Sequence, residues 1–280
     1  MDLTEHKQSL YRNKYFYLLT LIFFSVSSIS QEKNIVIKSA GSFDRNQSLY
    51  PDGNILNESA NKKVHLTHDN MDIFSKKSIF FQKRNSFIAT GNVHVQQGDS
   101  INLFCDSLNY DGLTRKFSSY GSVKFINDEM ELNSNVLFFD RNANEIYFNK
   151  NGKIIDSVST IKSKEGKYFI DEKKYEFKEN VIVENPDYKI RSNMMDYFLN
   201  SEITLFYKFS TIITDDYTIF CNEGFYDPQK KIGVFKKDAK VNSESRTIFG
   251  DSIFFDENKK YASASRNIKI IDEKENLIIK

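Results

Sequence analysis

The sequence predicts an all-β fold, an elongated jelly-roll-like stack of bent hairpins with a 29-residue repeat that follows an N-terminal signal segment. Aromatic residues recur at this spacing in one column: Phe81, Tyr110, Phe139, Tyr168, Tyr197, Tyr226 and Phe255. Seven residues upstream lies an apolar column: Phe74, Leu103, Leu132, Ile161, Ile190, Ile219 and Ile248. With 25 Phe, 15 Tyr and only 3 Pro, the composition favours strands. A fixed period of this length is typical of stacked supersecondary units, each too small to bury its own apolar face.

Residues 101–130 illustrate one repeat. The first arm, 101–110, carries apolar Leu103, Leu108 and Tyr110, an Asp-Gly turn follows at 111–112, and the second arm runs over 117–126. Small or polar residues interrupt each first arm: Cys105, Ser134, Ser163, Ser192, Cys221 and Gly250. Residues that tolerate positive φ interrupt the second arms: Gly91-Asn92, Gly121-Ser122, Gly152, Asn180 and Asn267. Arms that bend in the middle predict two facing sheets with an apolar interior and one groove along the stack.

The aromatic column permits two interpretations. Its side chains either pack as an ordinary core or line an open slot, if the two sheets separate along one side. The spacing is the same in both cases, so the sequence leaves the choice open.

The chain divides into three segments. Residues 1–30 are predicted to be a signal peptide or an uncleaved anchor, because three basic residues precede an apolar run at 15–26 and small residues follow it. Twelve residues are short for a membrane span. Residues 31–71 read as an irregular leader with an insertion at 57–70, and residues 72–280 as the repeat domain. Leu277 begins a further first arm, which indicates either a piece of a longer sequence or an open edge strand.

Several function classes are disfavoured. A net charge of +1 with interspersed signs gives no basic face, so nucleic acid is not expected as a partner. Cys105 and Cys221 occupy the same repeat position four repeats apart, about 19 Å at one strand spacing per repeat, which excludes a disulfide within one molecule. His65 and His68 lack a third ligand nearby and are expected in a solvated loop, and His94 is expected to face water. No metal site and no cofactor are therefore expected.

Catalysis is not expected either. Asp111 and Asp140 begin turns and are not matched by carboxylates in the neighbouring repeats, so they do not form an acid–base pair. The sequence contains no nucleophile elbow, phosphate loop or CxxC motif. We expect a protein that is not an enzyme.

Two segments carry a family resemblance: FIATGNVHVQQGDSINLFCDSLNYD at 87–111 and IFGDSIFFDENKK at 248–260. Each GNV-type bend, here at 91–93, precedes a D-S-L element, here at 106–108. These motifs resemble the OstA-like, or LptA-type, periplasmic domains that move lipopolysaccharide between membranes. Residues 185–193 and 218–231 resemble the longer OstA-like proteins of Bacteroidetes, and the resemblance covers about residues 72–280.

The resemblance implies a twisted β-jelly-roll in the periplasm of a Gram-negative bacterium. It implies a non-enzymatic carrier whose apolar groove holds the acyl chains of lipopolysaccharide, or a related glycolipid, and which helps to bridge the inner and outer membranes. It also implies contacts through terminal edge strands with other Lpt-type β-jelly-roll proteins, or head-to-tail self-association. The alternative is a structural protein that binds other proteins through its open edges. The candidate acyl-chain contacts are Phe81, Leu103, Leu108, Tyr110, Leu137, Phe139, Tyr168, Tyr197, Ile219, Tyr226, Ile253 and Phe255.

Overall fold

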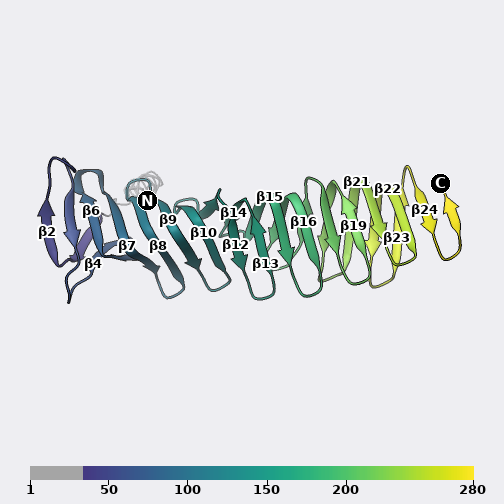
Figure 1. The fold of residues 1–280 in the computed structure, drawn as a ribbon, viewed down its shortest axis with the longest axis horizontal. Coiled ribbons are helices and arrows are strands. Elements are labelled where there is room, and N and C mark those ends of the chain that lie inside the picture. The colour runs from purple at the N-terminus through teal and green to yellow at the C-terminus, as the bar shows by residue number, and fades with distance from the viewer. Residues whose placement is uncertain (1–33) are drawn as a thin grey trace, which may run out of the picture. The chain divides into compact units, whose positions relative to one another are not determined.

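A computed structural model describes residues 34–280, and the predicted signal segment lies outside them. Within this range 25 antiparallel strands join in one continuous hydrogen-bonded sheet, with one short 3-10 helix at Gln82–Arg84. Figure 1 shows the strands following one another in sequence order. The described residues form no helix long and apolar enough to cross a membrane. The prediction of an all-β repeat fold is confirmed.

The strands are β1 (Val36–Ser39), β2 (Ser42–Arg45), β3 (Asn54–Asn57), β4 (Val64–His68), β5 (Met71–Ser75), β6 (Lys77–Phe81), β7 (Ser86–Gln97), β8 (Ile101–Asp111), β9 (Lys116–Ile126), β10 (Glu131–Asp140), β11 (Glu145–Phe148), β12 (Gly152–Ile155), β13 (Thr160–Ser163), β14 (Glu165–Phe169), β15 (Lys174–Glu184), β16 (Lys189–Phe198), β17 (Thr204–Phe206), β18 (Ser210–Ile213), β19 (Thr218–Cys221), β20 (Glu223–Asp227), β21 (Ile232–Asn242), β22 (Arg246–Asp256), β23 (Tyr261–Ser265), β24 (Lys269–Asp272) and β25 (Leu277–Ile279).

The two arms of one repeat are well seen in β8 and β9. They pair from Asn102↔Ile126 to Asp111↔Lys116, and the register shifts by one residue in the middle of β9. At the shift, Gly121 and Ser122 have φ of 74° and 45°. Paired positive φ values recur at the other bends: Gly91-Asn92, Glu179-Asn180, Lys237-Asp238 and Arg266-Asn267. The bends at 91–92, 121–122, 179–180 and 237–238 are β-bulges that turn the arm from one layer of the fold into the other.

Two layers result because the arms bend in the middle, and in several repeats the two halves of an arm pair with different strands. The first half of β10 pairs with β12, whereas its last three residues pair with β11. We call the layer with β12 the first layer and the layer with β11 the second layer. The rings of Phe125 in the first layer and Phe139 in the second meet edge to face at 6.4 Å, so the layers pack against each other.

The space between the layers is lined by two long cross-strand rows. The first layer contributes a mainly aliphatic row: Ile73, Val95, Leu103, Phe125, Leu132, Ile154, Ile161, Val183, Ile190, Ile212, Ile219, Val241, Ile248 and Ile270. The second layer contributes a mainly aromatic row, which we call the aromatic row: Phe80, Phe87, Tyr110, Phe117, Phe139, Ile146, Tyr168, Tyr175, Tyr197, Thr204, Tyr226, Gly233 and Phe255. Burial of each large apolar side chain contributes about 1.5–3 kcal/mol, so these rows dominate the stability of the stack.

Small residues lie where the arms pass between layers. In the first layer Cys105, Ser134, Ser163, Ser192, Cys221 and Gly250 occupy the interior positions next to the bends. Large side chains already fill the interior beside the bends, as at Gly152, where a Cβ atom would overlap the ring of Phe148. The small residues that interrupted the first arms in the sequence are therefore explained by packing at the corner.

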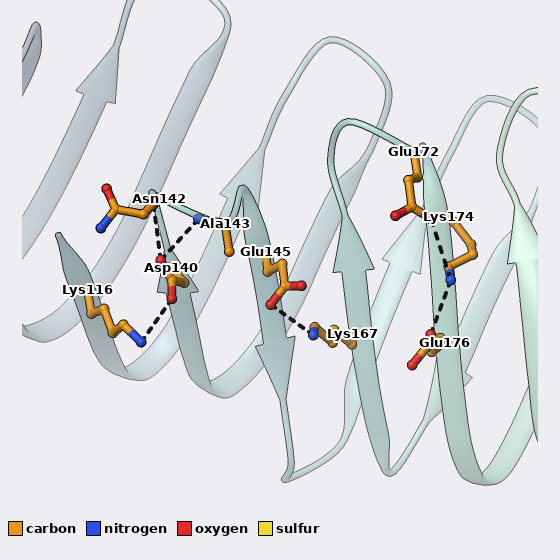
Figure 2. Close-up of polar contacts among 9 residues, drawn as sticks. All are labelled: Lys116, Asp140, Asn142, Ala143, Glu145, Lys167, Glu172, Lys174 and Glu176. Atoms are coloured by element: carbon orange, nitrogen blue, oxygen red, sulfur yellow. Dashed lines mark hydrogen bonds and ion pairs between the residues drawn. The ribbon is translucent and has the colours of Figure 1, made fainter. Parts of the chain in front are cut away.

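Polar side chains secure the turns and the outer face of the second layer (Figure 2). Asp140 accepts hydrogen bonds from the backbone N–H groups of Asn142 (3.0 Å) and Ala143 (3.2 Å). Its carboxylate also pairs with Lys116 at 2.9 Å, and this hydrogen bond is the main reason that the pKa of Asp140 is lowered. The prediction that Asp140 is a turn residue agrees with these contacts.

Main-chain hydrogen bonds join successive turns of the second layer. Each turn ends in a left-handed residue whose carbonyl accepts the N–H of the next turn: Arg115 from Arg141 (3.2 Å), Asn144 from Ile170 (3.0 Å), Lys173 from Leu199 (2.9 Å) and Lys231 from Glu257 (3.0 Å). At the corresponding donor position after Glu202 the chain has Pro228, which has no N–H. The turns therefore form a hydrogen-bonded row that is interrupted at Pro228.

Residues 36–68 differ from the irregular leader that the sequence predicts, because they form β1 to β4. The strand β1 pairs with β4, and β2 pairs with β3, so this segment is a further repeat with two layers. An eight-residue connection at 46–53 and a loop at 58–63 lengthen it. These additions put the strands out of phase with the 29-residue period, which is why the sequence pattern does not show them.

The first members of both columns are shifted by one residue. The aromatic row continues from Phe87 to Phe80, and the aliphatic row from Val95 to Ile73, so Phe81 and Phe74 are not the row members. Phe74 instead lies on the outer face, where its ring stacks on His65 at 4.4 Å and His94 at 6.0 Å. A one-residue shift moves a side chain to the opposite face of a strand, and the 29-residue spacing fails here for that reason.

Candidate functional site

The twelve candidate acyl-chain contacts are all buried, with exposures from 0% to 8%. Leu103 and Ile219 belong to the first layer and the other ten to the second layer. Eleven lie in one contiguous core between the layers, and Phe81 is buried outside this core. The structure thus brings the predicted residues together as facing walls of one interior.

The interior has a polar rim on the side where the turns lie. Turns of the first layer, such as 127–130, and turns of the second layer, such as 112–115, form the two edges of this rim, which we call the mouth. The hydroxyl of Tyr168, in the second layer, donates a 3.2 Å hydrogen bond to Glu129 in a first-layer turn. The aromatic row therefore lies directly beneath the mouth, with its tyrosine hydroxyls at the level of the turns.

Three polar contacts, which we call clasps, bridge the mouth. In the first clasp, Asp69 of a first-layer turn forms an ion pair with Arg115, and its backbone carbonyl accepts a 3.1 Å hydrogen bond from Arg141. In the second clasp, Glu129 forms an ion pair with Lys173 and accepts the hydrogen bond from Tyr168.

The third clasp reverses the position of the acid. Here Glu202, in a second-layer turn, accepts hydrogen bonds from Tyr188 (2.9 Å) and Asn185 (3.2 Å) of the first layer. The side chains of Lys173 and Glu129 in the second clasp are 42% and 28% exposed, and ion pairs this exposed contribute only about 0.2–1 kcal/mol. The ion pair of the second clasp therefore holds the mouth closed only weakly.

His68 adds a buried contact beside the first clasp. Its side chain is 2% exposed, and Nδ1 lies 2.7 Å from the hydroxyl of Tyr110, which also accepts a 3.3 Å hydrogen bond from Arg141. Burial raises the pKa of Tyr110, so the phenol stays protonated. The expected solvated loop is wrong for both histidines, because β4 contains His65 and His68. His65 contacts Asp72 at 2.6 Å, and the described residues contain no cluster of three metal-binding side chains.

Two tyrosines of the aromatic row make no well-formed hydrogen bond. The hydroxyls of Tyr175 and Tyr197 are buried without one, although the side chains of Ser159 and Tyr188 lie near that of Tyr197, and Oδ2 of Asp156 in the adjacent first-layer turn is unpaired. Burial raises the pKa of Tyr197 to about 12. These three atoms lie along the stretch of the mouth between the second and third clasps.

Beyond the third clasp the two layers enclose a groove of about 560 Å³. Val241 and Ile248 line it from the aliphatic row, and Phe255 lines it from the aromatic row. Ala262 replaces a large side chain at the end of the aromatic row and leaves room there. A second hollow of about 250 Å³, beside the third clasp, includes Tyr226. Of the twelve candidates, Tyr226 and Phe255 thus border open space.

Cys105 and Cys221 are buried and free, as the sequence predicts. Burial raises the pKa of each thiol to about 12, so neither is a thiolate at neutral pH. Both belong to the row of small residues at the bends and contribute packing rather than chemistry.

The clasps are contacts across the mouth that the sequence pattern misses. The position of Glu129 is occupied by Val158 one repeat later, and that of Lys173 by Glu202. A column of repeat positions detects only residue types that recur, and the clasps use different residues in each repeat. The tyrosines of the aromatic column were the one sign in the sequence that polar groups lie beside this row, because a buried tyrosine hydroxyl needs a hydrogen-bond partner.

Comparison with known proteins gives one family match. A family model described as OstA-like protein matches residues 32–193. Among solved structures, LptH, the LptA-homologous periplasmic component of the lipopolysaccharide transport device of Pseudomonas aeruginosa, is 16% identical with a TM-score of 0.37. That match covers 40% of this chain and 93% of LptH. A search of curated proteins gave no match.

Proposed function

The chain belongs to the OstA-like protein family, and we propose from this premise that it carries lipopolysaccharide or a related glycolipid through the periplasm. In this proposal the acyl chains lie between the two layers and the saccharide stays outside the mouth. The protein then helps to bridge the inner and outer membranes. Such a carrier needs no catalytic step, cofactor or metal.

The observation that carries the proposal is the amphipathic cross-section of the stack. Facing aliphatic and aromatic rows continue across successive repeats, and a polar mouth follows them along one side. Each methylene that leaves water gains about 0.8 kcal/mol, so a twelve-carbon chain gains about 10 kcal/mol. Similar environments in consecutive repeats allow a bound chain to move along the interior without a deep trap at any one site.

Entry of an acyl chain requires space. The groove beside Phe255 provides about 560 Å³ as it stands. Between the clasps, side chains fill the interior, and the layers must part there to admit a chain. The exposed ion pair of the second clasp opposes this separation only weakly.

Assembly with other proteins stays a prediction. The edge strand β2 exposes Phe43 at 59%, and β25 exposes Ile278 at 60%. We propose that another Lpt-type β-jelly-roll protein, or a second copy of this chain, adds a strand at such an edge.

Binding to purified lipopolysaccharide and to its deacylated saccharide tests the carrier proposal. The full-length glycolipid should bind, and the deacylated saccharide should neither bind nor compete, because the interior takes the acyl chains. Equal binding of both forms would place recognition outside the interior. Binding of neither, by a folded protein, would favour the alternative of a scaffold that acts through its edges.

A further inference from the structure

The middle of the aromatic row contains three consecutive tyrosines. Tyr168, Tyr175 and Tyr197 are direct cross-strand neighbours on β14, β15 and β16. Each is at most 1% exposed, and the rings of Tyr168 and Tyr175 stack at 4.4 Å. Because Tyr168 reaches Glu129 at the mouth, its stacked neighbour Tyr175 presents its hydroxyl at the same level.

The hydroxyls of Tyr175 and Tyr197 are not required for packing. The same row has Phe117, Phe139 and Phe255 at equivalent positions, so phenylalanine fills this space in other repeats. A buried hydroxyl without a partner destabilises the folded protein, whereas phenylalanine of the same shape does not. The two unpaired hydroxyls therefore point to a use in a bound state.

Asp156 supplies the complementary acceptor on the opposite edge of the mouth. Its Oδ1 accepts the backbone N–H groups of Val158 (2.9 Å) and Ser159 (2.6 Å), which fixes the side chain, while Oδ2 is buried and unpaired. The Ser159 hydroxyl in turn accepts a 3.1 Å hydrogen bond from Asn185. The carboxylate is thus held in place by its turn.

The protonation states of these groups are defined by their surroundings. Burial raises the pKa of Tyr175, and the nearby Tyr168, Asp156 and Glu129 raise it further. Burial also raises the pKa of Tyr197; the neighbouring side chains of Ser159 and Tyr188 partly oppose this rise, and Asp156 and Glu202 add to it. Both phenols are therefore hydrogen-bond donors at neutral pH.

We propose that Tyr175, Tyr197 and Asp156 form a subsite for a hydroxyl group near the base of an acyl chain. A hydroxyl accepts a hydrogen bond from a phenol and donates one to a carboxylate, so a single group satisfies both kinds of unpaired atom. The hydrocarbon beyond it enters the interior, where Phe177 and Met195 form the next row. This inference rests on the proposed carrier function and adds a preference for hydroxylated acyl chains over plain ones.

The test compares two acids of equal length on the full chain. Dissociation constants for tetradecanoic acid and 3-hydroxytetradecanoic acid are measured by displacement of a fluorescent amphiphile. The proposal predicts about tenfold tighter binding of the hydroxylated acid, the size of one good hydrogen bond to an otherwise unpaired group. The double variant Tyr175→Phe/Tyr197→Phe should bind both acids equally.

The matched control is Tyr147→Phe. Tyr147 is 43% exposed on the outer face of the second layer, and its variant should keep the tenfold preference. If the double variant does not fold, Asp156→Asn gives the same comparison, because it changes the acceptor at the surface turn. Equal binding of the two acids by the unchanged protein, or a preference that survives in the variants, would overturn the subsite. Binding of neither acid would overturn the carrier proposal itself.

Discussion

The clasps make a quantitative prediction about access to the interior. Lys173→Met removes the ion pair with Glu129, while Tyr168 continues to donate to the carboxylate, so no buried charge is left unpaired. An ion pair of this exposure contributes about 0.5 kcal/mol, which corresponds to a factor of about two in the population of a parted mouth. A triple variant that also contains Arg115→Met and Glu202→Met removes a contact from every clasp.

The three clasps lie in different repeats, so their effects should add. With about 0.5 kcal/mol for each of the two ion pairs and about the same for the hydrogen bonds of Glu202, the sum is about 1.5 kcal/mol, or about tenfold. Stopped-flow association of a fluorescent lipopolysaccharide should therefore be about tenfold faster with the triple variant, at nearly unchanged secondary structure. The control is Lys164→Met, which removes a more exposed ion pair with Glu179 at the bends, away from the mouth, and should leave the rate unchanged. A rate that is unchanged or lower in the triple variant would refute the role of the clasps.

Three further predictions concern packing, pH and the site. Gly152→Ala should destabilise the stack by about 1–3 kcal/mol in urea unfolding, because the added Cβ overlaps the Phe148 ring; an unchanged midpoint would contradict this packing. A hydrogen bond from Lys259 lowers the pKa of Asp256 in the folded protein. The ionised carboxylate therefore stabilises the fold above about pH 4, and this stabilisation is lost as the pH falls through the lowered pKa. The variant Asp256→Asn should accordingly lose less stability than the unchanged protein between pH 5 and pH 3, and parallel losses would exclude this carboxylate as a cause. Tyr168→Asp should reduce lipopolysaccharide capture more than Asp140→Asn at a turn, and equal reductions in folded variants would mean that the aromatic column is only core.

The arms of the central repeats were predictable because local chemistry and periodicity agree there. The second arm expected at 117–126 is β9, Lys116–Ile126, and its bend at Gly121 uses the residue type that positive φ favours. The bend at Lys237-Asp238 has the same geometry, with φ of 58° and 60°, but lysine gives no sign of it. At this bend the pairing of β21 with β22 on both sides imposes the positive φ, although lysine does not favour it.

Of the candidate site, the sequence predicts only the residues of the two facing rows. Residues such as Tyr197 and Ile219 recur in type at the repeat spacing, and the structure places them in facing rows. The clasps and Asp156 lie in turns whose residue types change from repeat to repeat, and the partners within the clasps lie 14 to 72 positions apart in the sequence. Contacts of this kind depend on how the layers face each other, which no periodic pattern records.

The central claim is that acyl chains lie between the two layers, and site-specific photo-crosslinking in cells tests it most directly. A photoreactive residue replaces Tyr168 or Tyr226 in the aromatic row, and Tyr147 on the outer face of the same layer, followed by blotting for lipopolysaccharide. The account predicts lipid adducts at the two interior positions and none at Tyr147. Adducts at Tyr147 alone, or protein adducts without lipid at any position, would contradict it.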